Sequence, residues 1–430
     1  MICDKFFTNV LFCCLVVQCL ARLKGFEKLT SIDEAMSTFL KELKLKLLKS
    51  VRVPVHLALN RVVAEDIKAE NDLPLFDRST VDGYAVRAKD TFQASQFRPR
   101  ILRLTGKERV QEKEARLVWT GNPLPHEADA VIMLEHTKKI PDGIEVGISV
   151  TPGENVSKRG EDVQKGEIAV KARTRLKPHH VGLLAALTVT HVNVVEKPKI
   201  AILSTGSELV DLGRKPKPNQ IVDVNRVVLS LMCQELGAES LSLSIAKDDI
   251  QEIATKISEG IKKADIVITT GGTSVGQADL VPTAIDQIGA PGVIVHGITM
   301  RPGMPTALAV LQGKPVIVLS GNPVAAMVGF EVFARPLILK LLGVENEPRP
   351  MLKATLTRRA PSALGRQAFL RVRVFEKDGE FFAEPIRIKG AGILSTMTKA
   401  NGYVIIPENC EGLEEGETVT VHLFDKMEKA

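Results

Sequence analysis

The chain has 430 residues, of which 44% are apolar and 25% charged, and its formal net charge is +6. This length predicts about two to four domains, and the composition is that of an ordinary globular protein. The positive charge is spread along the chain without a basic tail, so no nucleic-acid partner is indicated, whereas anionic small molecules suit it. Four of the six cysteines precede residue 20 and none has the spacing of zinc ligands, so we expect a reduced, cytoplasmic protein.

Residues 1–22 form an N-terminal extension with an apolar run at residues 10–17. The run is shorter than the roughly 20 residues of a membrane helix, and no clear small-residue cleavage site follows it. We therefore expect no membrane partner. A form tethered through residues 6–21 is the alternative, and cell fractionation would test it.

A helix is predicted from Leu29, with Thr30 or Ser31 as its N-cap and Glu34 as the capping-box partner. We expect its apolar stripe to continue and to pack on another helix or on a second subunit. The leucines of this stripe are Leu40, Leu43, Leu47 and Leu48.

Two loops with many turn residues follow, in a region of short alternating runs such as residues 101–104 and 144–150. One loop surrounds Asp82-Gly83, and the other begins at Thr120-Gly-Asn-Pro and runs into a strand. Taken alone, Asp-Gly predicts a plain hairpin turn. Together the runs indicate a β-domain of about 90 residues. Two of its loops contain more polar side chains than a plain turn requires, which is typical of functional loops.

Residues 153–166 form a polar, glycine-punctuated bridge that leaves this β-domain. Asp162 lies in this bridge and could be a cap or a ligand contact. Its charged neighbours favour the simpler interpretation, an ordinary surface-loop residue.

From Lys199 onwards strands alternate with helices, which predicts a doubly wound, mainly parallel sheet. Ligands on such sheets bind at the carboxyl ends of the strands. The predicted strands are residues 199–204, 241–246, 265–270, 293–296 and 314–319, and the helices are residues 225–236, 249–263, a helix ending at 288 and a long helix after 323.

The segment 265–280 has the order strand, loop of small residues, helix. Its glycines allow positive φ and close approach of a ligand, and its hydroxyls add donors, so the loop would suit a phosphate. A tight turn without a ligand is the simpler interpretation. The residues concerned are Thr270, Gly271, Gly272, Thr273, Ser274 and Gly276.

Four loops should meet at the carboxyl edge of the sheet: residues 205–208, 269–279, 301–304 and 320–323. Glu208, Asp248 and Asp279 would place carboxylates beside a phosphate, as magnesium-assisted chemistry requires. Each acid alone is more often a helix cap or a surface residue.

The chain resembles the MoeA-type molybdopterin molybdenumtransferases, which are related to the gephyrin E domain. The resemblance runs from about Leu29 to the end, on these motifs: Phe76-Asp-Arg-Ser-Thr-Val-Asp-Gly-Tyr-Ala-Val86, Thr120-Gly-Asn-Pro-Leu-Pro125, Arg159-Gly-Glu-Asp162, Ser204-Thr-Gly-Ser-Glu-Leu209, Thr270-Gly-Gly-Thr-Ser-Val-Gly276 and Gly321-Asn-Pro-Val324. It implies insertion of molybdenum from molybdate into adenylylated molybdopterin, with release of AMP. It also implies a homodimer of four-domain subunits whose site lies between the doubly wound domain of one subunit and the β-domain of the other. A separate molybdopterin adenylyltransferase is a further expected partner.

By the same resemblance, Asp82 and Thr120 are the contributions of the β-domain, and Asp162 is the acid of the Arg-Gly-Glu-Asp motif. Glu208, Asp248 and Asp279 are the acids of the doubly wound domain, and Asp279 with Glu208 would hold Mg²⁺. The substrate would further contact the glycine-rich loop together with Ser320, Asn322, Pro323, Arg301 and Arg366.

Two positions depart from the family pattern. Where the family commonly has Lys-Pro-Gly-Lys-Pro, this chain has Arg301-Pro-Gly-Met-Pro305, so Met304 brings no charge. Ala391 stands where the pattern usually has serine. Two of the four expected oxyanion contacts are thus altered, which leaves tungstate as an alternative to molybdate.

The predicted architecture is therefore an α/β multidomain chain that also has an inserted β-domain, an extended helical linker and dimerisation domain, and a C-terminal β-barrel-like domain. The alternatives to the enzyme are a molybdopterin-binding scaffold with little metal-insertion activity and an unrelated nucleotide-pyrophosphate hydrolase. The predicted domains are residues 23–67 with 160–196 (linker), 68–159 (inserted β-domain), 197–346 (doubly wound) and 347–430 (C-terminal).

Overall fold

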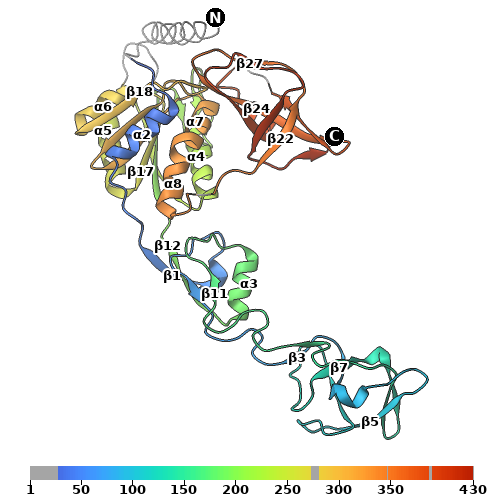
Figure 1. The fold of residues 1–430 in the computed structure, drawn as a ribbon. Coiled ribbons are helices and arrows are strands. Elements are labelled where there is room, and N and C mark those ends of the chain that lie inside the picture. Colours follow the sequence, from blue (N-terminus) through green and yellow to red (C-terminus); the bar gives the residue numbers. More distant parts are fainter. Residues whose placement is uncertain (1–27, 273–279, 346, 387–389, 430) are drawn as a thin grey trace, which may run out of the picture. The chain divides into compact units, whose positions relative to one another are not determined.

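The computed structural model describes residues 28–272, 280–345, 347–386 and 390–429. The chain divides into two compact units, of which Ser50–Val195 is one, and the described residues on both sides of it form the other (Figure 1). Several sequence predictions lie outside the described residues. These are the extension at residues 1–22 and the contacts of Thr273, Ser274, Gly276 and Asp279.

The first helix, α2 (Ile32–Glu42), begins as predicted, because the Ser31 side chain accepts a hydrogen bond from the Glu34 backbone N–H at 3.3 Å. It buries Ala35 and Phe39. The prediction that the helical stripe continues to Leu48 is wrong. Leu43 is extended, and the backbone N–H of Lys44 donates to the carbonyl of Gly313, so the chain leaves the helix to bond to another segment.

The unit Ser50–Val195 contains a small linker layer and a β-domain. In the linker layer β1 pairs antiparallel with β12, and β2 with β11, beside helix α3. Their buried core includes Val55, Leu176 and Leu184. The bounds are β1 (Ser50–Pro54), β2 (Ile67–Lys68), β11 (Ile168–Val170), α3 (Pro178–Ala186) and β12 (His191–Val195).

The β-domain is a six-stranded sheet in the order β7-β4-β6-β5-β9-β8. Gly83 opens β4 between two neighbouring strands, and a Cβ there would lie 2.0 Å from the Ile132 carbonyl oxygen. Asp82-Gly83 is thus the entry to a central strand and not a hairpin turn. The bounds are β4 (Gly83–Val86), β5 (Arg100–Leu104), β6 (Glu114–Val118), β7 (Ala130–Met133), β8 (Thr137–Ile140) and β9 (Gly143–Val146), and β3 (Arg78–Ser79) pairs separately with β10 (Val156–Ser157).

The second unit contains the predicted doubly wound sheet, in the order β16-β13-β17-β21-β20-β18. Its first four strands are parallel, whereas β20 runs antiparallel to β18 and β21 and was not predicted. The bounds are β13 (Lys199–Thr205), β16 (Glu239–Ala246), β17 (Ile266–Thr270), β18 (Pro291–His296), β20 (Ala307–Leu311) and β21 (Lys314–Leu319).

Helices cover both faces of this sheet (Figure 1). The isoleucines of α5 pack with α6 on one face, in a core that includes Ile253, Ile257 and Val267. Helices α4 and α7 lie on the other face. The bounds are α4 (Val224–Glu235), α5 (Ile250–Lys263), α6 (Leu280–Ile288) and α7 (Pro323–Gly329).

The single long helix predicted after Pro323 is interrupted. Helix α7 passes into a π-helical turn, Phe330–Ala334, before α8 (Arg335–Leu342). Pro336 stands at the start of α8 and has no backbone N–H to continue the α-helical ladder.

The C-terminal region is a closed five-stranded barrel in the order β24-β25-β22-β28-β26, with β26 pairing back onto β24. A short strand of the preceding region, β19 (Met300–Arg301), pairs in parallel with the start of β24. This pairing joins the barrel to the carboxyl edge of the doubly wound sheet. The bounds are β22 (Met351–Leu356), β24 (Gln367–Lys377), β25 (Glu380–Pro385), β26 (Gly402–Ile406) and β28 (Thr418–Leu423).

Candidate functional site

The loops that follow β13, β17 and β21 lie against one another at the carboxyl edge of the sheet. The N–H of Gly271 donates to the Leu319 carbonyl at 3.2 Å, and the Asn225 side-chain amide donates to the Gly321 carbonyl at 2.8 Å. The N–H of Gly206 donates to the carbonyl of Ala246, the last residue of β16. The structure thus brings together segments that the sequence places far apart.

Gly271 and Gly272 make this close approach possible. Their φ angles are +89° and +65°, in the region that disfavours side chains. A Cβ on Gly271 would lie 2.4 Å from the Thr205 carbonyl oxygen, and one on Gly272 would lie 2.6 Å from Val281. Larger residues would therefore push the loop away from its neighbours.

One cavity at this edge, which we call the acidic hollow, has Glu208 and Asp248 in its wall. Asp248 accepts a hydrogen bond from the Ser207 backbone N–H at 3.0 Å, which fixes the carboxylate to the turn that carries Glu208. The predicted residues that line the hollow are Glu208, Asp248, Thr270, Gly271, Gly272, Ser320, Asn322 and Pro323.

Asn225, which the sequence did not indicate, also lines the acidic hollow. It is only 8% exposed, and its amide nitrogen is engaged by Gly321. Its Oδ1 has no hydrogen-bond partner among the described residues. A buried acceptor without a partner costs free energy, so this oxygen is suited to accept a hydrogen bond from a ligand.

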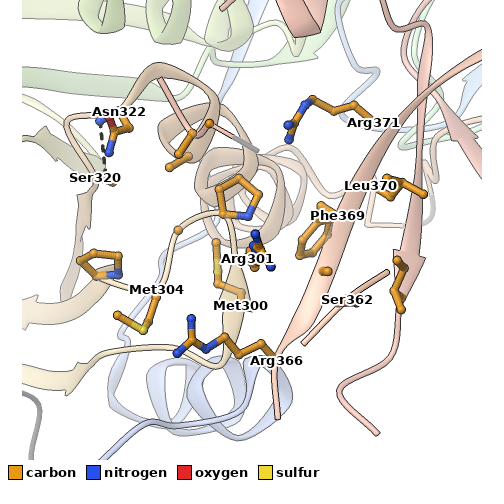
Figure 2. Close-up of a pocket in the computed structure, with 18 of the residues that line it drawn as sticks. Met300, Arg301, Met304, Ser320, Asn322, Ser362, Arg366, Phe369, Leu370 and Arg371 are labelled. Atoms are coloured by element: carbon orange, nitrogen blue, oxygen red, sulfur yellow. Dashed lines mark hydrogen bonds between the residues drawn. The ribbon is translucent and has the colours of Figure 1, made fainter. Parts of the chain in front are cut away.

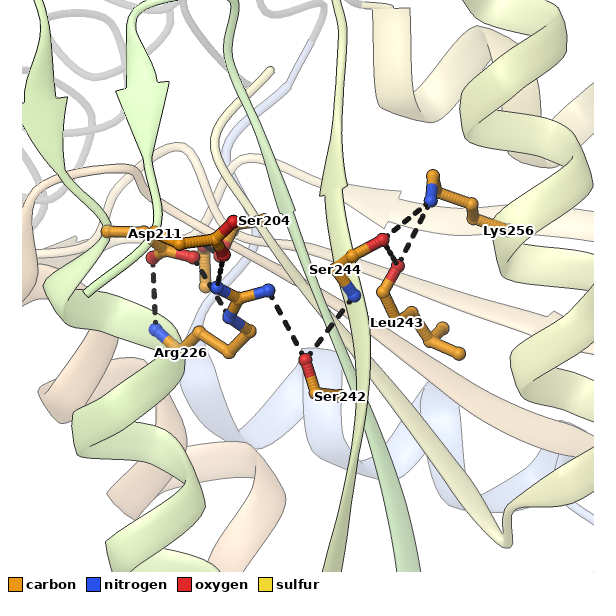
Figure 3. Close-up of polar contacts among 9 residues, drawn as sticks. Ser204, Asp211, Arg226, Ser242, Leu243, Ser244 and Lys256 are labelled. Atoms are coloured by element: carbon orange, nitrogen blue, oxygen red, sulfur yellow. Dashed lines mark hydrogen bonds and ion pairs between the residues drawn. The ribbon is translucent and has the colours of Figure 1, made fainter. Parts of the chain in front are cut away.

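A two-stranded arm, β14 (Leu209–Val210) with β15 (Ile221–Val222), forms another wall of the acidic hollow. Arg226 of α4 holds this arm (Figure 3). Its guanidinium donates to Asp211 just after β14 and to Ser242 of β16 at 3.2 Å, and it pairs with Asp223 at 3.2 Å. The bond from Arg226 lowers the pKa of Asp211.

A second cavity of about 340 Å³, the arginine hollow, lies between residues 300–305 and the barrel (Figure 2). Arg301, Arg366 and Arg371 all line it, and no aspartate or glutamate is among the described residues of its wall. Met304 and Ala391, the two departures from the family pattern, line it as well. The structure therefore gathers three cations where the sequence indicated two.

Burial and like charge act together on the guanidinium groups of the arginine hollow. Burial, and then the positive charge of Arg301, lower the pKa of both Arg366 and Arg371. Arg349 shows the opposite behaviour. Burial opposes its charge too, but its bonds to Glu331 raise the pKa of Arg349.

The two hollows adjoin, because Pro305, Ser320 and Asn322 line both. The acidic hollow, at about 640 Å³, is the larger and would take the larger of two ligands. A small oxyanion suits the arginine hollow, since guanidinium groups bind tetrahedral oxyanions through paired donors.

In the other unit, Asp82 and Thr120 are hydrogen-bonded to each other. The Asp82 carboxylate accepts hydrogen bonds from the Thr120 backbone N–H at 2.8 Å and from its hydroxyl at 2.7 Å. These bonds lower the pKa of Asp82. Asp162 is exposed in a loop, and its backbone N–H donates to the Leu73 carbonyl at 3.0 Å.

The described residues contain no group of three or more histidine, cysteine, aspartate or glutamate side chains placed to hold a metal. Glu208 and Asp248 nevertheless supply the carboxylate oxygens that Mg²⁺ prefers, in one wall of one hollow. Among the helices that the structure describes, none is long and apolar enough to cross a membrane.

Family models match most of the chain. They are the MoeA N-terminal region (domain I and II) over residues 30–188, a molybdopterin binding domain over residues 201–340, and the MoeA C-terminal region (domain IV) over residues 353–424.

Molybdopterin molybdenumtransferases of Bacillus subtilis and Haemophilus influenzae are 35% and 32% identical to the chain. The first match covers 85% of this chain and 88% of the relative, and the second covers 92% and 99%. The crystal structure of the molybdopterin biosynthesis MoeA protein from Pyrococcus horikoshii matches with a TM-score of 0.79 at 35% identity, over 92% of this chain and 100% of that one.

Proposed function

The chain belongs to the MoeA family of molybdopterin molybdenumtransferases, enzymes of molybdenum cofactor biosynthesis, and we propose that it transfers molybdenum from molybdate into adenylylated molybdopterin with release of AMP. One observation carries the proposal: an acidic and a cationic hollow adjoin through Pro305, Ser320 and Asn322. A pterin held in the first could meet an oxyanion held in the second without leaving its site. Tungstate has the same shape and charge and is the alternative metal source.

The adenylylated pterin binds in the acidic hollow. Thr270, Gly271 and Gly272 border its phosphates, and Asn225 Oδ1 accepts a hydrogen bond from the ligand. Glu208 and Asp248 would hold Mg²⁺, since the third carboxylate in the wall, Asp223, is paired with Arg226. When bound, the ion would neutralise phosphate charge on the adenylate. The same role for Asp279 rests on the resemblance, because Asp279 lies outside the described residues.

The enzyme acts as a homodimer in which Asp82 and Thr120 of one subunit complete the site of the other. Their mutual hydrogen bonds support a single shared role. Asp162 contributes to the site from the same unit. The proposal also includes the division of the chain into the N-terminal extension and the four domains predicted from the sequence. The free thiols Cys233 and Cys410 agree with a cytoplasmic setting, where a molybdopterin adenylyltransferase would supply the substrate.

The decisive experiment incubates the purified protein with adenylylated molybdopterin, Mg²⁺ and either molybdate or tungstate, and follows AMP. We expect release with at least one oxyanion. Glu208→Gln should slow it by about tenfold or more, because the neutral amide is a poor magnesium ligand. Glu259→Gln is the matched control, since Glu259 lies on α5 and pairs with Lys263 at 2.7 Å, away from both hollows.

Absence of AMP release from the wild type with either oxyanion would contradict the enzyme proposal. If the wild type binds the adenylylated pterin tightly under those conditions, the scaffold alternative is favoured instead.

A further inference from the structure

We propose that Arg371 is a third cationic contact for the oxyanion, acting with Arg301 and Arg366 and setting the affinity of the arginine hollow. This inference rests on the proposed function, since it concerns the oxyanion substrate of that reaction. It assigns a role to a residue that no motif of the sequence indicated.

The position of Arg371 on β24 is unusual for a buried arginine. Alternate residues of this strand, Ala368, Leu370, Val372 and Val374, belong to the core of the barrel. Arg371 belongs to the opposite set, which points out of the barrel. It is nevertheless only 5% exposed, and it lines the arginine hollow (Figure 2). The strand therefore directs a charged group into the space between the barrel and the doubly wound sheet.

The pairing of β19 with β24 fixes the three arginines relative to one another. Met300 lies opposite Gln367 and Arg301 opposite Ala368, and the Gln367 N–H donates to the Thr299 carbonyl at 2.9 Å. Arg366 immediately precedes β24, and Arg371 follows five residues later. Arg301 and Arg371 lie on paired strands and Arg366 stands directly before one, so the fold sets the separation of the three side chains.

The charge of the wall favours an anion. The described wall of the arginine hollow offers three guanidinium groups and no carboxylate. The lowered pKa of Arg371, caused by burial and then by Arg301, agrees with a site arranged for an incoming negative charge. A dianionic tetrahedral oxyanion carries the opposite charge and would accept the paired donors.

Met304 makes the contribution of Arg371 testable. It is 9% exposed in the same hollow and supplies a thioether, which carries no charge. Arg371 thus raises the cation count of the hollow from two to three, and a lysine at position 304 would restore that count if Arg371 were neutralised.

The test is direct binding of molybdate to the full-length protein, measured by titration calorimetry without pterin. We expect Arg371→Gln to weaken binding by about 10- to 100-fold, the effect of losing a charge-assisted bond. Met304→Lys added to Arg371→Gln should recover at least part of that loss. The control is Arg373→Gln, on the same outward face of β24 but paired with Glu428 at 2.7 Å and outside the hollow, which should bind as the wild type does.

Equal molybdate affinity of wild type and folded Arg371→Gln would overturn the inference while leaving the proposed function in place. If the wild type binds neither molybdate nor tungstate, the oxyanion site of the proposed function fails as well. Should Arg371→Gln not fold, Arg371→Lys takes its place, because it keeps the buried stem and the charge. Its ammonium lacks the paired donors, so we expect binding about threefold weaker or worse, and unchanged affinity would again overturn the inference.

Discussion

Arg226 connects three parts of the chain around the acidic hollow: the arm, α4 and β16. The carboxylate of Asp211 is 46% exposed, so its bond to Arg226 adds little to global stability and mainly positions the arm. We predict that Asp211→Ala raises KM for the adenylylated pterin about 3- to 10-fold and leaves kcat nearly unchanged, because the displaced wall weakens binding before chemistry. Steady-state AMP release with varied pterin concentration measures both constants.

Arg226→Met is the informative comparison for that variant. The side chain of Asp223 is only 1% exposed, so removing its guanidinium partner leaves a buried carboxylate without its charge partner. Arg226→Met should therefore lower the free energy of unfolding by about 3 kcal/mol, whereas Asp211→Ala should melt close to the wild type. An unchanged KM in Asp211→Ala would show that the arm does not depend on this bond.

At the scale of elements, the close packing of α5 on the sheet depends on Gly260. A Cβ there would lie 2.9 Å from Leu243 Cδ1 and 3.1 Å from Val267 Cγ2. We predict that Gly260→Ala lowers the free energy of unfolding by about 1–3 kcal/mol through overpacking, even though alanine favours helix. Scanning calorimetry would detect this as a lower melting temperature of the unit that contains α5.

Gly182 of α3 provides the matched control for Gly260. It is also helical, but nothing lies within 4 Å of a Cβ built on it. Gly182→Ala should therefore raise the free energy of unfolding by about 0.5–1 kcal/mol, from reduced backbone freedom in the unfolded chain. If the two substitutions changed the free energy of unfolding equally, close packing would not explain the effect of Gly260→Ala.

At the scale of the whole molecule, the proposed homodimer predicts complementation between two inactive variants. Asp82→Asn and Asp248→Asn each alter one side of the shared site, and these residues lie in different compact units of the chain. In a mixed dimer, one site carries both substitutions and the other carries neither. Co-expression of the two variants should therefore restore about a quarter of the wild-type AMP release, since about half the dimers are mixed and each has one intact site of two.

Each variant expressed alone is the control for this experiment and should release little AMP. If the co-expressed pair is as inactive as either parent, Asp82 and Asp248 act within one subunit and the shared site is refuted. Light scattering on the same samples gives the oligomeric state independently.

Much of the fold followed from the sequence, because its signals are local. Ser31 and Glu34 mark the start of α2, the isoleucines of α5 mark a buried helical face, and the alternation of strand and helix predicts the parallel sheet. The meeting of the loops at Thr205, Gly271 and Gly321 was also predictable, since parallel strands all end at one edge.

Tertiary structure alone decided how the arginine hollow is built. The pairing of β19 with β24 joins segments far apart in the chain, and no local pattern encodes which distant edge a short strand meets. That pairing brings Arg301 to Arg366 and reveals Arg371, which the sequence alone does not distinguish from Arg373 in the same strand. The sequence by itself determined at which edge of the sheet the loops meet. The packing of the barrel against that edge decided the number of cations, because burial and charge depend on neighbours that only the folded chain supplies.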